Sequence, residues 1–280
     1  MPIHDQSYRR YRGGRAALGR GWIVIATTGV KSMIRKRAFI GVLLFGWVQF
    51  IVRAVQIYLA TNIPQAAILA PTAETFRDFL EKQDFFVFIV TIYVGAGLIA
   101  NDRRANALQI YLSKPLLRSE YIAGKAAILV TFLALVTWVP AILLLFIQVM
   151  FAGSFTFMRA NLFLFPAITV ASLLQVLLAT FTMLAFSSLS KSSRYVGILY
   201  AGILFFSAAI YGAMYAITGG STTLSYLSLG ANLTQVVDVI FRLPPRYATP
   251  WQVSLTVVLG LIILSISVLE RRVRGVEVVT

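Results

Sequence analysis

The sequence predicts an all-α integral membrane protein with six transmembrane helices. Apolar residues fill 59% of its 280 positions and charged residues only 12%, whereas a soluble domain is about half apolar and a quarter charged. A bilayer core about 30 Å thick requires roughly 20 apolar residues per helix. Because backbone polar groups find no water in lipid, such runs are expected to be helices. The runs lie at residues 38–59, 85–100, 126–151, 162–189, 196–217 and 251–269.

The distribution of Lys and Arg predicts the orientation. Nineteen lie in the tails and loops on the N-terminal side of the membrane, five lie on the opposite side, and Arg53 lies inside the first span. Positive residues stay cytoplasmic during insertion, so we expect a multi-pass protein of the cell membrane with both termini inside. This topology, with the attraction of anionic lipids, accounts for the net charge of +15. The charge therefore gives no indication of a nucleic-acid partner.

The N-terminal region divides into a tail and an amphipathic helix. Residues 1–17 form a basic tail, and residues 18–280 are expected to form one transmembrane domain. Within 18–37, Trp22, Ile25 and Val30 recur at helical spacing opposite Lys31. Such a helix lies in the membrane interface. The pattern leaves open whether it is only an anchor or also contacts a partner.

Two external segments are expected to carry short amphipathic helices. The first begins near Thr72, and its charged residues are expected to face water, with i,i+4 pairs between Arg77 and Glu81 and between Asp78 and Lys82. The second lies within 218–250 and opposes an apolar face to a polar one. Its polar residues are Asn232, Gln235, Asp238 and Arg242. Prolines 140 and 166 predict kinks in the third and fourth spans.

The residues of a catalytic site are missing. There is no Cys, and the one His, His4, lies in the basic tail. No Asp or Glu occurs between Tyr121 and Val237, and we expect none at depth in any span. The chain then lacks the usual relays of proton-driven carriers and offers no metal site. It also has no P-loop. We therefore expect no enzyme and no cofactor in this chain; if the protein uses ATP, the nucleotide and its magnesium must be bound by another chain.

Two features inside the spans are candidates for a translocation path. Arg53 lies about 22 Å along the first span, where its side chain could snorkel to the interface or face a cavity. Tyr200, Ser207, Tyr211 and Tyr215 share one face of the fifth span. That stripe could line a cavity for an amphipathic substrate or serve helix packing and an aromatic belt.

The segment 101–125 is the most distinctive part of the chain. Gly95 and Gly97 end the second span, and Asp102 follows. Leu108, Tyr111 and Leu112 then form the apolar side of a short helix, with Arg104 placed elsewhere. Pro115 breaks that helix, and a new one starts near Ser119 and leads through Glu120 to Gly124-Lys125.

These features together resemble the ABC-2 type permeases, the membrane subunits of ATP-driven exporters. The resemblance covers the chain from about Trp22 onward. It implies a complex of two permease chains, alike or different, with two ATPase chains. It also implies that the 101–125 loop is the coupling helix that docks on the ATPase. The coupling residues would be Asp102, Arg104, Leu108, Tyr111, Leu112, Pro115 and Glu120.

The resemblance leaves several points open. Many relatives carry Glu and Gly-Thr where this chain has Asp102 and Asn106-Ala107, which weakens a subfamily assignment. The family exports drugs, peptides, lipids and polysaccharides, and an apolar interior favours a hydrophobic or amphipathic cargo. Two alternatives share the composition, an ion-coupled secondary carrier and a non-transporting scaffold subunit.

Overall fold

The structure is a computed structural model that describes residues 20–63, 70–107, 116–151, 159 and 161–273. The described residues form helices and connecting turns, and six helices are long and apolar enough to cross a membrane. All six end within four residues of the predicted runs, and four also begin within three residues of them, whereas the second begins 12 residues and the third 8 residues earlier than predicted. The six are Arg37–Asn62, Ala73–Arg104, Arg118–Phe151, Leu164–Leu189, Ser193–Ile217 and Trp251–Arg272.

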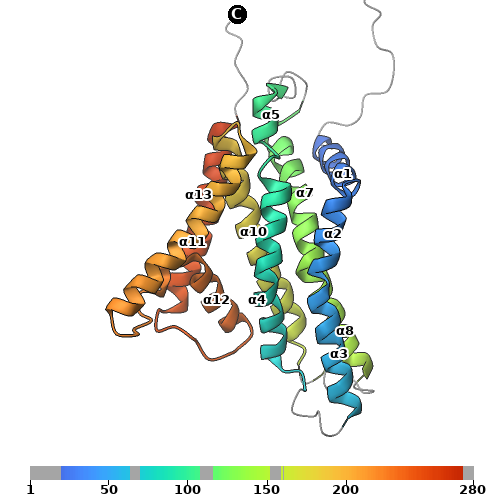
Figure 1. The fold of residues 1–280 in the computed structure, drawn as a ribbon, viewed down its shortest axis with the longest axis vertical. Helices are drawn as coiled ribbons and strands as arrows, with labels where there is room; N and C mark the ends of the chain where they lie inside the picture. The colour runs from blue at the N-terminus through green and yellow to red at the C-terminus, as the bar shows by residue number, and fades with distance from the viewer. Residues whose placement is uncertain (1–19, 64–69, 108–115, 152–158, 160, 274–280) are drawn as a thin grey trace, which may run out of the picture.

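The spans run back and forth as a bundle (Figure 1). The first span is α2 (Arg37–Gly46) with α3 (Val48–Asn62), and the second is α4 (Ala73–Val90), the π-helix η2 (Thr91–Gly95) and α5 (Ala100–Arg104). The third is α7 (Arg118–Val136) with α8 (Trp138–Phe151), followed by α10 (Leu164–Leu189), α11 (Ser193–Ile217) and α13 (Trp251–Arg272). Outside the spans lie α1 (Gly21–Ile34), the 3₁₀ turn η3 (Ser225–Leu227) and α12 (Leu229–Ile240).

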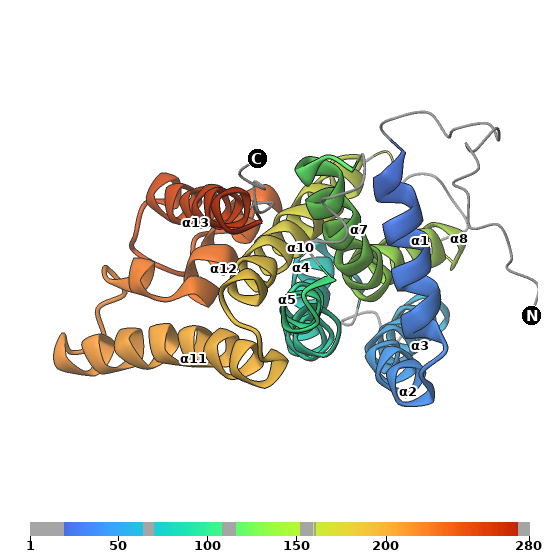
Figure 2. The ribbon, with the colours of Figure 1, turned by 90° about the horizontal axis from the view of Figure 1, so that it is seen from above.

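The two ends of the bundle differ. One end carries α1, α5 and the C-terminal end of α13, and we call it the α5 end (Figure 1). The opposite end carries α12 and is called the α12 end. Helix α11 leaves the α5 end beside α10 and diverges from it, and α12 lies between α11 and α13 (Figure 2). Only 11% of the most apolar 18-residue stretch of α11 is buried.

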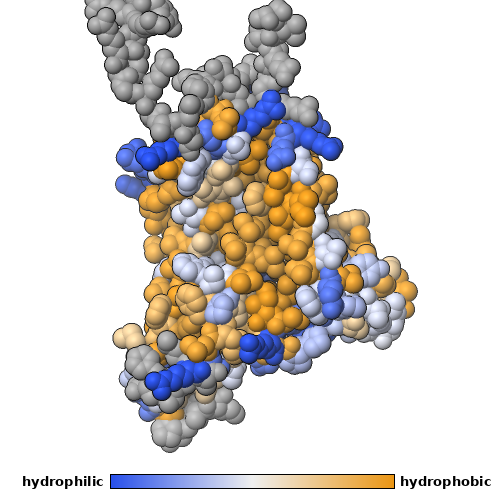
Figure 3. All heavy atoms as spheres, turned by 180° about the vertical axis from the view of Figure 1, so that it is seen from behind, coloured by the Kyte–Doolittle hydropathy of each residue, from blue (hydrophilic) through white to orange (hydrophobic). Residues whose placement is uncertain are grey.

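The core is built around α10. Toward the α5 end, Val90, Leu129 and Met183 are fully buried in one apolar cluster, and toward the α12 end Phe76 and Ile168 belong to a second. Large exposed apolar side chains cover the sides of the bundle. Figure 3 shows them as a broad apolar region whose ends are hydrophilic. A surface of this kind is the lipid-facing surface that the composition predicts.

Helix α1 lies across the bundle and packs on α7 (Figure 2). The helices approach closely at Gly124, where an added Cβ would lie 2.8 Å from the Cβ of Ile25. Val30 and Met33 pack against the main core, while Trp22 remains 40% exposed. The amphipathic helix predicted at 18–37 is therefore present, and its apolar side is divided between the protein and the surroundings. The basic tail 1–17 lies outside the described residues.

The interruptions of the spans match the proline prediction only in part. The third span breaks at Thr137, three residues before Pro140, which removes a helical N–H donor. Pro166 instead lies in the first turn of α10, where no intrahelical hydrogen bond is lost. The kink predicted there is therefore absent. The break of the first span at Trp47 was not predicted.

The largest departure concerns the second span. The predicted external helix near Thr72 and the predicted span are one continuous helix, α4. No Gly or Pro interrupts the residues between Ala73 and Val90, so nothing forces the chain to turn. The described span consequently contains Asp84. Asp84 lies one residue before the predicted run, and the expectation that no acidic residue lies at depth in the membrane stays a prediction.

Candidate functional site

At the α5 end, Asp102 connects the second span to the third. The hydroxyl of Tyr121 donates to Oδ2 of Asp102 at 2.7 Å, and Nζ of Lys125 lies 2.6 Å from the same oxygen. Tyr121 is fully buried, and the ammonium of Lys125 also lies 5.4 Å from its ring centroid. Partly buried, hydrogen-bonded ion pairs of this kind hold their geometry better than exposed ones. Asp102 thus fixes α5 against α7 immediately before the 108–115 segment.

Glu120 performs the same task on the other side of that segment. It is the third residue of α7 and only 7% exposed. Its Oε2 accepts from the backbone N–H of Leu117 at 3.1 Å, and its Oε1 accepts from that of Gly21 at 3.2 Å. One carboxylate therefore satisfies backbone donors at the starts of both α7 and α1. Negative charge at these positions is also favoured by the helix dipoles.

A third contact holds the break in the second span. Between η2 and α5 the chain leaves regular helix geometry, and the backbone groups there need other partners. The hydroxyl of Ser187 in α10 accepts from Ile99 N at 3.1 Å and from Ala100 N at 3.0 Å, and donates to Ala96 O at 2.9 Å. Arg103 also donates to the backbone oxygen of Ser188. The end of the second span is thereby fastened to α10.

The coupling residues predicted from the sequence are only partly described. Asp102 and Glu120 hold the two sides of the loop as above, and Arg104 is exposed. Asn106 has a φ of +53°, a left-handed conformation that Asn and Gly adopt more easily than other residues. Asn106 is therefore suited to the turn that follows α5. Leu108, Tyr111, Leu112 and Pro115 lie outside the described residues.

A second candidate region is a cavity of about 280 Å³ toward the α12 end. It is lined by residues of α4, α10, α11, α12 and α13, in the space where α11 diverges from α10 (Figure 1). Most of its lining is apolar, including Phe88, Leu178, Leu204 and Phe205. Ligand sites are typically concave and apolar with a few polar groups. This cavity therefore has the character of a binding site.

The polar groups of the cavity include Asp84 and Gln175. The amide nitrogen of Gln175, whose side chain is otherwise buried, donates to Oδ1 of Asp84. Asp84 is itself accessible, because it lines this cavity and a narrower pocket beside it. The candidate path residues predicted from the sequence, Arg53 and the stripe on the fifth span, did not include Asp84. The helical pattern that continues without a break from Ala73 could have indicated that Asp84 belongs to the second span.

The candidate path residues are distributed over two sides of the bundle. Tyr200 lines the cavity and stacks on Phe88 with ring centroids 6.1 Å apart. Ser207 accepts from the backbone of Leu229 at 3.4 Å. Further along α11, the rings of Tyr211 and Tyr215 lie 6.1 Å apart.

Arg53 is placed elsewhere. Its Nη1 donates to Oε1 of Gln56 at 2.6 Å, and both residues belong to α3. Helix α3 lies across the bundle from α11 (Figure 2). The structure therefore does not bring Arg53 and the fifth-span tyrosines together within one chain.

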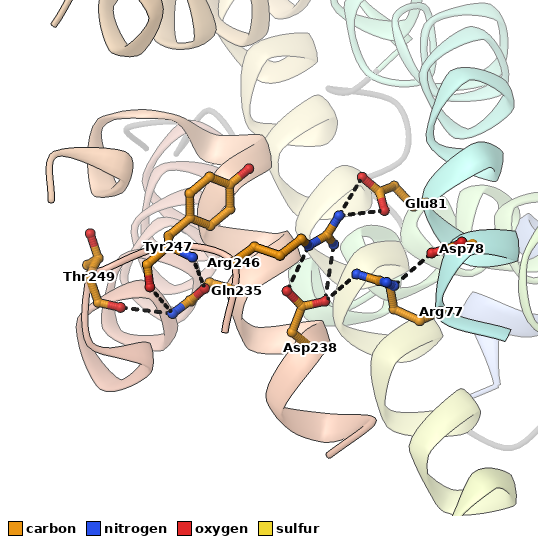
Figure 4. A network of polar contacts seen from close by, with 8 residues as sticks. All are labelled: Arg77, Asp78, Glu81, Gln235, Asp238, Arg246, Tyr247 and Thr249. Atoms are coloured by element: carbon orange, nitrogen blue, oxygen red, sulfur yellow. Dashed lines mark hydrogen bonds and ion pairs between the residues drawn. The ribbon is translucent and has the colours of Figure 1, made fainter. Parts of the chain in front are cut away.

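An ion network closes the α12 end beside this cavity (Figure 4). Asp238 of α12 is fully buried and accepts from Arg77 Nη1 at 2.9 Å and from Arg246 Nε at 2.8 Å. Arg246 also reaches Glu81 at 3.1 Å, and Arg77 reaches Asp78 at 2.8 Å. Burial alone would lower the pKa of Arg246, but the hydrogen bond and charge of Asp238 and the charge of Glu81 outweigh it and raise that pKa.

This network replaces the predicted water-facing pattern. Arg77 pairs with Asp78 and Asp238, not with Glu81, and the polar side of α12 is buried. Gln235 donates to the backbone oxygens of Tyr247 at 3.1 Å and Thr249 at 2.9 Å (Figure 4). The sequence could not reveal these pairs, because they join positions up to 165 residues apart.

The comparison with known families identifies the class of protein. The sequence model of the ABC-2 family transporter proteins matches residues 23–272, which is most of the chain and includes both candidate regions. The chain belongs to this family and is a membrane subunit of an ABC transporter. A search of curated proteins found no match.

Proposed function

We propose that this chain forms the substrate path of an ATP-driven exporter, together with a second permease chain, and is driven by separate ATPase subunits docked on the 101–125 loop. The observation that carries the proposal is the attachment of this loop on both sides. Asp102 fastens its start to α7, and Glu120 fastens its end to α1. Through these contacts, a displacement at either side of the loop would reach α5, α7 and α1.

The orientation follows from charge. We place the α5 end in the cytoplasm, because the Lys- and Arg-rich segments predicted to be inside adjoin that end. Both termini would then be cytoplasmic, and α12 would lie at the outer surface. In that position the ion network of Asp238 would help to close the outer end of the path.

The path itself is proposed to include the α4–α11 cavity. The outward face of α11 is apolar and exposed, with Ile198 and Phe206 each more than 60% exposed. A second permease chain on this side would convert the cavity into an enclosed passage. Lipid contact alone accounts for the same exposure, and that is the expectation if the chain is a scaffold subunit.

One observation favours the alternative of an ion-coupled carrier. Asp84 is a carboxylate in a spanning helix, and such residues often serve as ion relays. The two functions differ in their energy source. Transport by a secondary carrier would continue when the ATPase subunit is deleted, whereas transport by an ABC exporter would stop.

The docking proposal is tested by replacing Leu108 and Tyr111 together with Ala. Buried apolar anchors dominate helix-in-groove contacts and cost about 2 kcal/mol or more when truncated. We expect recovery of a co-expressed, epitope-tagged ATPase with the double variant to fall at least about tenfold at matched membrane levels.

The matched control replaces two exposed apolar residues at the α12 end, Ile63 and Ile217, with Ala. It should retain the ATPase fully. Equal recovery with the wild type, the loop variant and the control would show that the loop is not the docking element.

A further inference from the structure

The α4–α11 cavity has an unusual charge distribution. Among the described residues that line it, Asp84 is the only one with a charged side chain. Its Oδ1 accepts the one hydrogen bond that it makes within the described part of the chain, from the neutral amide of Gln175. A carboxylate held in this way keeps an acceptor oxygen for a ligand. Its charge is not cancelled by the bond.

The nearby arginines are already engaged. Arg77 and Arg246 are the cations of the adjacent ion network, and they are shared among three carboxylates, Asp78, Glu81 and Asp238. That network therefore contains one more carboxylate than cation. It adds to the negative potential around Asp84 and does not neutralise it. Anionic ligands are disfavoured on this ground.

The remaining lining selects against a bare metal ion. Magnesium and calcium require several oxygen ligands, and among the described residues no three acidic or His side chains are grouped to hold a metal. The cavity presents instead the aromatic rings of Phe88, Tyr200 and Phe205. Aromatic faces attract organic cations and also bury apolar groups.

We propose that the cavity binds an amphipathic organic cation, with Asp84 as its counter-ion and the aromatic side chains of α4 and α11 around its apolar body. The volume of about 280 Å³ is near the lower end of the range of about 300–1,000 Å³ found for ligand pockets, which suits a compact molecule. The inference rests on the proposed function, because it names the substrate class of that path.

The test uses phenyltrimethylammonium, a compact lipophilic cation, and phenyltrifluoroborate, an anion of similar shape. Binding of each is measured by equilibrium titration to the full-length permease in lipid nanodiscs, without ATPase. We expect saturable binding of the cation, weakened about tenfold or more in Asp84→Asn, since the amide keeps the shape and loses the charge. Binding of the anion should be weaker and should not fall in the variant.

Two further variants control this result. Glu74→Gln removes an exposed carboxylate from the same helix and should leave cation binding unchanged. Asp84→Glu restores the charge and should recover most of the affinity, which separates the effect of charge from a folding defect. The proposal is overturned if Asp84→Asn binds the cation as the wild type does, or if the anion binds equally well.

The outcome is independent of the docking test. Asp84-insensitive binding together with full ATPase recovery would overturn the substrate class and leave the exporter function standing. Asp84-dependent binding together with no ATPase association would support the cation site and overturn the exporter function.

Discussion

Individual polar side chains position helices that are distant in the sequence. Ser187 holds the backbone of the broken second span through three hydrogen bonds, and Asp238 lies between two arginines from different segments. Neither environment could be predicted from its own neighbours in the chain, because each partner lies on another element. Asp102 differs in that its partners, Tyr121 and Lys125, are only 19 and 23 residues away.

Replacing Ser187 with Ala should loosen the break in the second span. The backbone N–H groups of Ile99 and Ala100 would lose a buried acceptor, at a cost of about 1–3 kcal/mol. We expect faster hydrogen exchange in the peptide covering residues 96–104 and a lower melting temperature in detergent. Ser188→Ala is the control, since among the described residues that hydroxyl bonds only Ala185 of its own helix. Equal exchange in the two variants would contradict the assigned role of Ser187.

Replacing Asp238 with Ala should strongly destabilise the α12 end. The change leaves Arg77 without its buried partner, and breaking such a pair costs about 3–5 kcal/mol. We expect the lower part of this range, because Arg246 remains partly exposed. The comparison is Asp78→Ala, which removes an exposed partner of Arg77 and should cost less than about 1 kcal/mol. Similar melting temperatures for both variants would show that the buried network contributes little.

At the scale of elements, hydrophobic runs were sufficient to place the spans but not their interruptions. Run length follows from bilayer thickness, which acts on every residue of a helix alike. Whether a helix continues depends on local helix-breaking residues such as Gly and Pro. Because none follows Ala73 before Val90, α4 runs through both predicted elements. The polar side of an amphipathic helix is usually expected to face water, but the polar side of α12 is buried. Its polar side chains bond loops and helices that the pattern cannot identify.

The close packing of α1 on α7 gives a prediction about a single methyl group. In Gly124→Ala the new Cβ would lie 2.8 Å from Ile25 Cβ and 3.0 Å from the backbone oxygen of Trp22. Overpacking of this kind costs about 1–3 kcal/mol, so the melting temperature should fall. Gly202→Ala in α11 meets no atom within 4 Å and should be neutral or slightly stabilising. A neutral Gly124→Ala would mean that α1 is not seated as described.

At the scale of the whole molecule, the charge asymmetry predicts the orientation and the fold supplies positions that can test it. The chain has no Cys, so single Cys residues can be introduced without a background. Lys82→Cys, near the α12 end, should react with an impermeant maleimide in intact cells. Arg35→Cys, near the α5 end, should react only after the membrane is opened. Both positions are exposed, and the reverse labelling pattern would contradict the orientation and the placement of the loop.

The central claim is that the chain contributes a transport path while a partner supplies the energy. The most direct measurement is ATP hydrolysis by the tagged full-length protein purified from its own membranes, before and after the co-purifying subunits are removed. We predict hydrolysis in the complex, accompanied by a P-loop ATPase identified by mass spectrometry, and none in the isolated chain. Hydrolysis by the isolated chain, or transport by membranes that contain no associated ATPase, would contradict the account.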